Sequence, residues 1–381
     1  MIPSFTPRFH RSIPPFVLAL AVMLSACDSG GAADGGGDNG VETSGPLPRV
    51  EAENCNIDIS RFADGGVPPD GIPALTNPEL VSPDEIGGFL ADDSRVIGFF
   101  VDGQAYAAPH NILWWHEIAN FDLGETKLAV TYCPLTGSSI AFDRAAVGGG
   151  TFGVSGLLYQ NNLTMYDRTD NVSLWPQMIG SAGCGARVGT SLTKFPVIEM
   201  TWGAWKTLYP ESRVVSSNTG FNRNYRPTGY PYGDYEELNN PALLDSRTGL
   251  DRSRPPKERG LGIPVGTGGM VFPFGLLDDT DKPVRAVHET VGGEDVVVFW
   301  DEAAQTAMAY RPRLDGQRLT FSESDGKLVD AETGSVWDVS GRAVSGPKAG
   351  ARLEPVTEAY IAFWFAWAVF QPDVEIWNGG S

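Results

Sequence analysis

Histidine and cysteine are scarce in this sequence, with four of each among 381 residues. Basic residues are also few: 28 lysines and arginines stand against 47 acidic residues, for a net charge of −19. Such an acidic chain repels phosphate, which argues against nucleic acid or an anionic membrane surface as a partner. The sequence has no P-loop, no dinucleotide-binding glycine motif, no Gly-x-Ser-x-Gly elbow and no His-Glu-x-x-His pair, so it lacks the signatures of those enzyme classes.

A hydrophobic run long enough to span a bilayer is missing as well. The apolar stretch Phe16–Leu24 is too short, and it follows Arg8 and Arg11. It ends in the letters LSAC, which resemble a bacterial lipobox. We therefore predict that residues 1–26 are a lipoprotein signal peptide and that Cys27 carries the lipid. The protein would then be anchored to a membrane of the cell envelope, facing the periplasm or the outside; the alternative is an ordinary signal peptide with a chance cysteine.

The remaining composition favours short strands and many turns. Residues 27–49 are mostly Gly, Asp and Ser, which predicts a flexible linker, and 50–93 form an N-terminal extension. Glycine (46) and proline (28) are plentiful, and aromatic residues make up 10% of the chain. We expect a mainly β protein with a few short helices.

The chain also repeats itself. The same spacing separates Trp175 from Trp205 and Trp337 from Trp367. We predict an internal duplication of two tandem, related β-rich units, 94–216 and a degenerate 270–381, joined by a loop-rich connector, 217–269. The repeat further predicts a hairpin in each unit, at 98–107 and 275–287, and a short helix around Trp205 and around Trp367. It aligns His116-Glu117 with His288-Glu289, and Cys133 with Asp301.

Several motifs together resemble one family of exported bacterial and archaeal proteins, Domain of Unknown Function 3179. The resemblance covers nearly all of the chain after the linker, but the family's name supplies no reaction. Many members have a second cysteine where this chain has Thr136. The motifs are GGVPPDGIPAL (65–75), WWHEIAN (114–120), VTYCPLTGSSIAFDR (130–144), FGVSGLLYQNNLTMYDR (152–168), SLWPQMIG (173–180), NRNYRPTGYPYGDY (222–235) and AFWFAWAVFQPDVEIW (362–377).

The sharpest candidate site combines His116, Glu117 and Cys133. A thiolate beside an imidazole can bind copper or zinc, or act as an activated nucleophile. Glu117 can serve as a ligand, as a base or as the group that orients the imidazole. The alternative is structural: the His-Glu pair braces the fold, and Cys133 is a small buried residue at a strand end. Whether the protein is an enzyme stays open at this point.

Other residues are weaker candidates. Asp167, Gln177, Arg223 and Tyr225 could line a cleft, although an Asp–Arg pair such as Asp167-Arg168 often only ties a turn. The same aromatic cleft could instead grip a glycan or a peptide, and a structural role in an envelope complex is a third possibility. With Cys27 lipidated, three cysteines remain, so at least one is unpaired. A Cys55–Cys184 disulfide would tie down the extension and leave Cys133 free.

Overall fold

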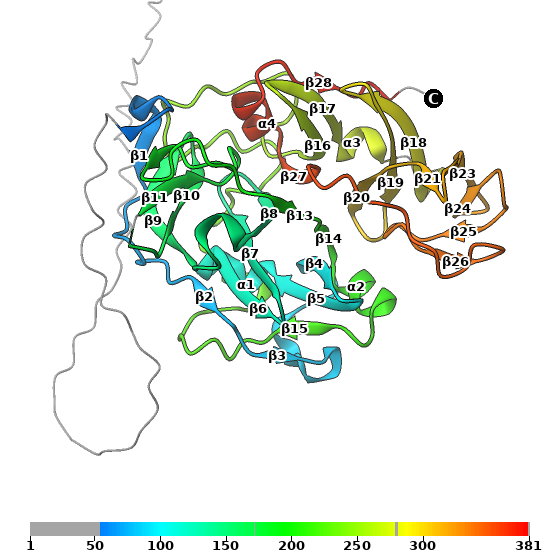
Figure 1. Cartoon of the computed structure of the whole chain (residues 1–381), viewed down its shortest axis with the longest axis horizontal. Coiled ribbons are helices and arrows are strands. Elements are labelled where there is room, and N and C mark those ends of the chain that lie inside the picture. Colours follow the sequence, from blue (N-terminus) through cyan, green and yellow to red (C-terminus); the bar gives the residue numbers. More distant parts are fainter. Residues whose placement is uncertain (1–53, 171, 279–280, 380–381) are drawn as a thin grey trace, which may run out of the picture. The chain divides into compact units, whose positions relative to one another are not determined.

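The computed structural model describes residues 54–170, 172–278 and 281–379. The predicted signal peptide, the predicted lipidation site Cys27 and the predicted linker lie outside these residues. The described chain is mainly β, with several sheets and helices of at most seven residues (Figure 1). None of the described helices is both long and apolar enough to cross a membrane.

The predicted first hairpin is present, and it forms the centre of a five-stranded sheet. Asp102 and Gly103 both have positive φ, 51° and 80°, which suits a tight turn between twisted strands. The strand order is β14-β4-β5-β15-β3, with β15 parallel to β5. The strands are β3 (Leu80–Val81), β4 (Arg95–Val101), β5 (Gln104–Pro109), β14 (Ile198–Thr201) and β15 (Arg213–Val215).

A second sheet carries the cysteine motif. Its order is β13-β8-β7-β6-β2, and from Leu128 to Cys133 its central strand β7 is entirely buried. This burial explains the continuous apolar run of β7, since a strand covered on both faces has no polar side. The strands are β2 (Leu75–Thr76), β6 (Ile118–Leu123), β7 (Thr126–Cys133), β8 (Ser138–Asp143) and β13 (Lys194–Phe195).

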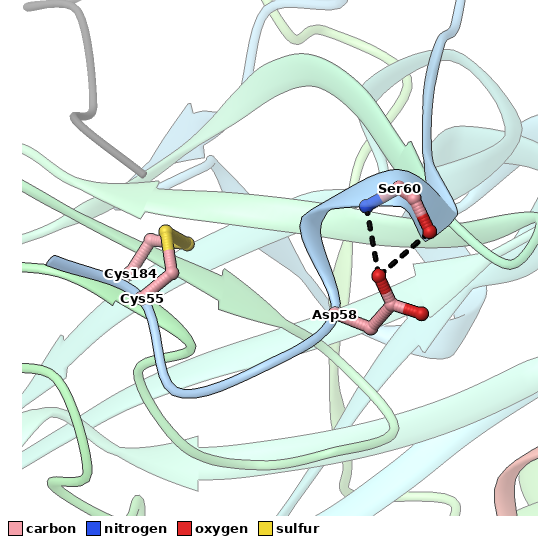
Figure 2. The surroundings of a disulfide bond; sticks show 4 residues. All are labelled: Cys55, Asp58, Ser60 and Cys184. Atoms are coloured by element: carbon pink, nitrogen blue, oxygen red, sulfur yellow. Dashed lines mark hydrogen bonds between the residues drawn. A yellow bond between two sulfur atoms is a disulfide. The ribbon is translucent and has the colours of Figure 1, made fainter. Parts of the chain in front are cut away.

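A third sheet completes the N-terminal part of the described chain, in the order β1-β9-β10-β11-β12. A disulfide joins Cys55 in the extension to Cys184 in β12 (Figure 2). Beside it, the Asp58 carboxylate accepts hydrogen bonds from the backbone N–H and the hydroxyl of Ser60. The strands are β1 (Phe62–Asp64), β9 (Phe152–Tyr159), β10 (Asn162–Asp167), β11 (Ser173–Pro176) and β12 (Cys184–Gly185).

The C-terminal part has the sheets β27-β16-β17-β28, β18-β19-β20, β23-β24-β25-β26 and β21-β22. The β21-β22 sheet is a two-stranded hairpin, and β28 is parallel to β17. The strands are β16 (Arg259–Val265), β17 (Gly268–Pro273), β18 (Val284–Val291), β19 (Glu294–Asp301), β20 (Thr306–Tyr310), β21 (Arg313–Leu314), β22 (Gln317–Arg318), β23 (Phe321–Ser324), β24 (Lys327–Asp330), β25 (Val336–Trp337), β26 (Ala343–Ser345), β27 (Tyr360–Phe363) and β28 (Glu375–Ile376).

The hairpin predicted at 275–287 is wrong. β17 pairs with β16 across the turn at Gly266, and β18 pairs with β19. A short helix, α3, follows β17 directly, so the Asp-rich segment after it joins a helix to a strand. The strand β16 also lies inside residues 217–269, the range that the sequence predicts to be a loop-rich connector.

Short helices appear where the repeated tryptophans predict them. Trp205 in α2 packs over Gly98, where an added Cβ atom would lie only 2.0 Å from the indole. Trp367 in α4 packs over Gly262 in the same way, at 2.4 Å. The helices are α1 (His110–His116), α2 (Trp202–Leu208), α3 (Phe274–Leu277) and α4 (Trp364–Phe370), with 3-10 turns η2 (Ile59–Arg61), η3 (Pro83–Glu85), η4 (Gly87–Phe89), η5 (Arg144–Val147) and η6 (Pro227–Gly229).

Buried side chains connect the two parts of the chain. One apolar cluster contains Phe99 and Trp205 together with Phe299 and Tyr310. The backbone N–H of Thr201 donates to the Ala304 carbonyl at 3.0 Å. The core is therefore continuous across both parts rather than divided between them.

Candidate functional site

Cys133 occupies the last position of β7, opposite Ser138 of β8. Pro134 follows and has no N–H to continue the strand pairing. The thiol is free and only 1% exposed; its S–H donates to the Asn161 carbonyl at 3.8 Å, and its sulfur accepts the Leu163 N–H at 3.3 Å. Burial raises the pKa of Cys133 to about 11, although hydrogen bonds from Thr136 and Leu163 oppose this rise. The resting thiol is therefore neutral, and donors already surround its sulfur.

Glu117 lies next to Cys133 in an unusual backbone conformation. Its φ of 55° and ψ of −32° belong to a region that side-chain-bearing residues rarely adopt. This turn ends α1 and starts β6, while the Glu117 carbonyl accepts the Tyr132 N–H at 2.8 Å. Glu117 is only 5% exposed as a residue, and its side chain has no hydrogen-bond partner among the described residues; its carboxyl oxygens are not fully buried.

The environment of Glu117 favours its neutral form. Burial raises the pKa of this carboxyl group to about 8. Its charge in turn contributes to the raised pKa of Cys133, which shows that the two groups are close enough to interact. A buried acid with a pKa near 8 beside a thiol is a combination found at sites of proton transfer.

His116 does not join this pair. Its Nδ1 lies 2.7 Å from the Pro73 carbonyl and its Nε2 lies 2.6 Å from the Tyr225 hydroxyl. Since the carbonyl can only accept, Nδ1 carries the proton and the Tyr225 hydroxyl donates to Nε2. Burial lowers the pKa of His116 to about 4, so the ring is neutral. Both ring nitrogens are thus occupied within the protein.

The predicted metal site is consequently not assembled. Within residues 54–170, 172–278 and 281–379, no group of three or more His, Cys, Asp or Glu side chains is arranged to hold a metal ion. The physical reason is the backbone turn between two adjacent residues, which sends His116 toward Tyr225 and Glu117 toward Cys133. The copper or zinc expected from the sequence therefore has no donor set around His116, Glu117 and Cys133.

A buried polar network supports the loop that follows Cys133. Gln177 donates to the Thr131 hydroxyl at 2.8 Å and accepts from the Ser138 hydroxyl at 2.5 Å. Asn162 donates to Gln177 at 2.9 Å and to the Thr136 hydroxyl at 3.0 Å. Gln177 thus holds the cysteine loop in place instead of facing a ligand.

The connector covers the site with aromatic side chains. Tyr235 donates its hydroxyl to the Leu135 carbonyl at 2.9 Å, and the Lys257 ammonium lies 3.8 Å from the centre of the Tyr235 ring. Burial raises the pKa of Tyr232, and the charges of Glu117 and Cys133 raise it further. Tyr232 is therefore close enough to both groups for their charges to act on it, and it belongs to the segment that the sequence predicts to pack on the β-rich units.

The four residues proposed for a cleft do not form one. Asp167 is buried and accepts the indole N–H of Trp175 at 2.8 Å, a structural contact. Gln177 belongs to the network beneath the cysteine loop. Arg223 stacks over the Trp115 ring, with its Cζ 5.9 Å from the ring centre, and lies near Tyr225, which bonds His116. These residues therefore occupy three separate surroundings.

His288 differs from His116 in its setting as well. It lies within β18, where its Nε2 accepts the backbone N–H of Phe321 at 2.9 Å. Glu289 accepts the indole N–H of Trp377 at 3.1 Å. The second His-Glu pair is therefore occupied by structural hydrogen bonds, and Glu117 alone of the two glutamates has no such bond.

Sequence reasoning missed a buried charge cluster centred on Glu199 of β14. Its carboxylate accepts the Ser139 hydroxyl at 2.5 Å, pairs with Arg95, and lies 3.8 Å from Arg259 of β16. Burial alone would raise the pKa of Glu199, but Arg95, His110 and Arg259 outweigh it and lower the pKa to about 2. The sequence contained one signal for this cluster: a glutamate within the otherwise largely apolar segment IEMT.

This cluster reaches the cysteine strand through Tyr132. The His110 ring stacks on Tyr132 with ring centres 4.0 Å apart, and the Tyr132 hydroxyl donates to Glu236 of the connector at 3.0 Å. Arg259 in turn donates to Glu236 at 3.2 Å. Tyr132, the residue before Cys133, is thus held by the His110 ring on one side and by the Glu236 carboxylate of the connector on the other.

Comparison with known proteins gives one match. The family profile described as "Protein of unknown function (DUF3179)" matches residues 69–374. No curated protein matches the chain, and no solved structure does. Because the match covers most of the sequence, including the cysteine loop, the glutamate and the covering connector, this chain belongs to the DUF3179 family.

Proposed function

We propose that the protein is a thiol-dependent protein of the cell envelope in which Cys133 is the nucleophile and Glu117 is its proton acceptor. One observation carries the proposal: Glu117 is a residue of 5% exposure whose carboxyl group has no hydrogen-bond partner among the described residues, held beside a free thiol by a strained backbone. Strain of this kind costs about 1–3 kcal/mol and persists where the surrounding structure enforces it, often at functional sites. A purely structural glutamate would find a partner, as Glu289 does with Trp377.

The proposed chemistry begins with proton transfer from the Cys133 sulfur to the Glu117 carboxylate. The pKa values of about 11 for the thiol and about 8 for the acid separate the two states by on the order of 4 kcal/mol. Hydrogen bonds from Thr136 and Leu163 then stabilise the thiolate. The thiolate attacks an electrophilic substrate, and the proton on Glu117 is available for the leaving group.

Alkylation of Cys133 by iodoacetamide, followed by mass spectrometry, tests this role. We expect the rate for the native protein to rise as the pH passes through about 8, because Glu117 must be ionised to accept the proton. Glu117→Gln should slow the reaction at pH 9 by roughly 100-fold, the lower end of general-base effects.

The matched control is Glu125→Gln, which changes an exposed glutamate in the turn of the same β6-β7 hairpin and should leave the rate unchanged. Electrostatics alone predicts the opposite sign for Glu117→Gln, since losing a nearby negative charge lowers the pKa of the thiol. An equal or faster reaction in Glu117→Gln would therefore reject Glu117 as the base.

We further infer that Cys27 carries a lipid that anchors the protein to the envelope membrane. The basic leader, the short apolar run and the letters LSAC support this anchor, and the linker 27–49 supplies its tether. Cys27→Ser should block lipidation and leave an unprocessed precursor that keeps residues 1–26, as seen by its larger mass on immunoblots. A variant that matures normally and stays on the membrane would contradict the anchor.

We also propose that the two β-rich parts arose by duplication. The sheets β14-β4-β5-β15 and β27-β16-β17-β28 have the same order and the same strand directions. Each of these sheets has a helix whose tryptophan packs over a glycine of the sheet: Trp205 over Gly98 of β4, and Trp367 over Gly262 of β16. Asp330 accepts the indole N–H of Trp337 at 2.9 Å, as Asp167 does for Trp175. An experimental structure in which these paired tryptophans make unlike contacts would contradict the duplication.

In this alignment only the first unit keeps the proposed chemistry. Asp301 takes the place of Cys133, since it pairs with Thr306 as Cys133 pairs with Ser138. The sequence alignment of the two His-Glu pairs needs correction, however. Thr131, two residues before Cys133, pairs with Ile118, and Phe299, two residues before Asp301, pairs with Ala286. Ile118 therefore matches Ala286, so His116 matches Val284 and not His288.

A further inference from the structure

An apolar cavity of about 310 Å³ lies apart from the cysteine site. It is bounded by the β4-β5 hairpin and the start of β14 on one side, and by β20 and residues 340–355 on the other. Its size falls at the lower end of small-molecule sites. The side chains that matter most are Phe100, Val197, Met308, Tyr310, Arg352 and Leu353.

One side chain among those lining the cavity is charged. Arg352 is exposed and lies over the Phe100 ring, with its Cζ 5.0 Å from the ring centre. None of the ion pairs within 4.0 Å among the described residues includes Arg352; Asp338, whose charge acts with that of Arg352 on Tyr209 and Tyr310, is the nearby acid. In a protein with a net charge of −19, a guanidinium left without a carboxylate is available for an anion from outside.

Behind the lining of this end of the cavity lies a second polar group, the hydroxyl of Tyr209. The Tyr209 hydroxyl is buried beside Ser340 and Arg352 and forms no hydrogen bond of normal geometry with a described residue. Its ring packs against Phe100 with ring centres 5.0 Å apart. Tyr209 does not line the cavity and its hydroxyl is buried, so its ring supports Phe100 from behind and its hydroxyl does not meet a ligand.

We propose that this cavity binds a small amphiphile that has an apolar chain and a single carboxylate. The chain would pack against the apolar walls, while the carboxylate would accept hydrogen bonds from Arg352. A sugar would find few hydrogen-bonding groups along the walls, and a cation would be repelled by Arg352. The site is independent of Cys133 and does not rest on the proposed thiol chemistry.

Calorimetric titration tests the proposal with three ten-carbon probes: decanoate, decanol and decyltrimethylammonium. The protein is the predicted mature chain, residues 27–381, expressed without the leader and with Cys27→Ser, so that neither a lipid nor detergent competes. We expect decanoate to bind at least tenfold more tightly than decanol, and the cationic probe to bind most weakly. Arg352→Gln should remove the preference for decanoate, because the charge-assisted hydrogen bonds are lost.

Arg342→Gln is the matched control, since Arg342 is also exposed but does not line the cavity, and decanoate binding should be unchanged. Leu353→Trp fills the cavity and should abolish binding of all three probes. Because Leu353 is buried, the fold of the Leu353→Trp variant must be checked by circular dichroism. Arg352→Gln alters an exposed side chain, so its result alone decides whether the proposal stands. Equal decanoate binding in Arg352→Gln and native protein, or no saturable binding to the native protein, overturns the proposal.

Discussion

Removing the disulfide by the double substitution Cys55→Ser and Cys184→Ser lowers the free energy of unfolding by about 5 kcal/mol. The expected loss is large because the two cysteines are 129 residues apart in the sequence, so the bond closes a long loop. Without it, the unfolded chain regains the conformational freedom that the cross-link removes. Urea denaturation followed by tryptophan fluorescence measures the change.

Two comparisons sharpen this experiment. Native protein treated with a reducing agent should unfold at the same urea concentration as the double variant. Cys133→Ser removes the free thiol without opening any loop, so its effect should be smaller. A loss below about 1 kcal/mol in the double variant would mean that other contacts of the extension, such as the pairing of β1 with β9, already hold it in place.

The second large effect concerns Glu117 and pH. Its pKa is raised from 4.5 to about 8 in the folded protein, so the folded state keeps a proton that the unfolded chain releases. Stability from this group is full below pH 4.5 and is lost as the pH rises through about 8. The interval corresponds to on the order of 5 kcal/mol. Glu117→Gln should therefore stabilise the protein at pH 9 and change it little at pH 4.

Urea midpoints at pH 5 and pH 9 measure this difference, with Glu125→Gln as the exposed control. An identical pH profile for native protein and Glu117→Gln would show that the carboxyl group is solvated in solution. That outcome would also remove the basis for Glu117 as a base with a raised pKa.

The buried histidines act in the opposite direction. Burial lowers the pKa of His110 to about 3 and that of His116 to about 4. The unfolded chain binds protons at both positions below pH 6.5, so the stability they provide is lost as the pH falls through that range. Together with Glu117, these groups place their combined maximum of stability near pH 6.5.

The sequence was a good guide to features that depend on neighbouring residues. The Asp102-Gly103 turn and the helices around Trp205 and Trp367 follow from local turn chemistry and aromatic spacing. The hairpin predicted at 275–287 was wrong because Asp-rich segments resemble turns whether they join two strands or, as here, a helix and a strand. The turn at Gly266 carries a weaker signal than those aspartates.

The candidate site depended on information that no local pattern contains. His116 and Glu117 are adjacent, yet the left-handed φ of Glu117 separates their side chains. The contact of Glu199 with Arg259 links residues 60 positions apart in the chain, and the tyrosines over Cys133 come from a segment about 100 residues further along. Such contacts arise from the packing of whole sheets, which a single sequence does not encode in any readable spacing.

The aromatic cover over Cys133 has a kinetic consequence. Since the thiol is 1% exposed, a reagent in solution meets it only during brief separations of the connector from the cysteine loop. The observed rate of modification is then the product of an opening equilibrium and the rate for the uncovered thiol. Substitutions in Tyr235 or Lys257 would act on the first factor, because these residues hold the connector on the cysteine loop. The connector then determines how often the thiol can react, and the cysteine loop determines how fast.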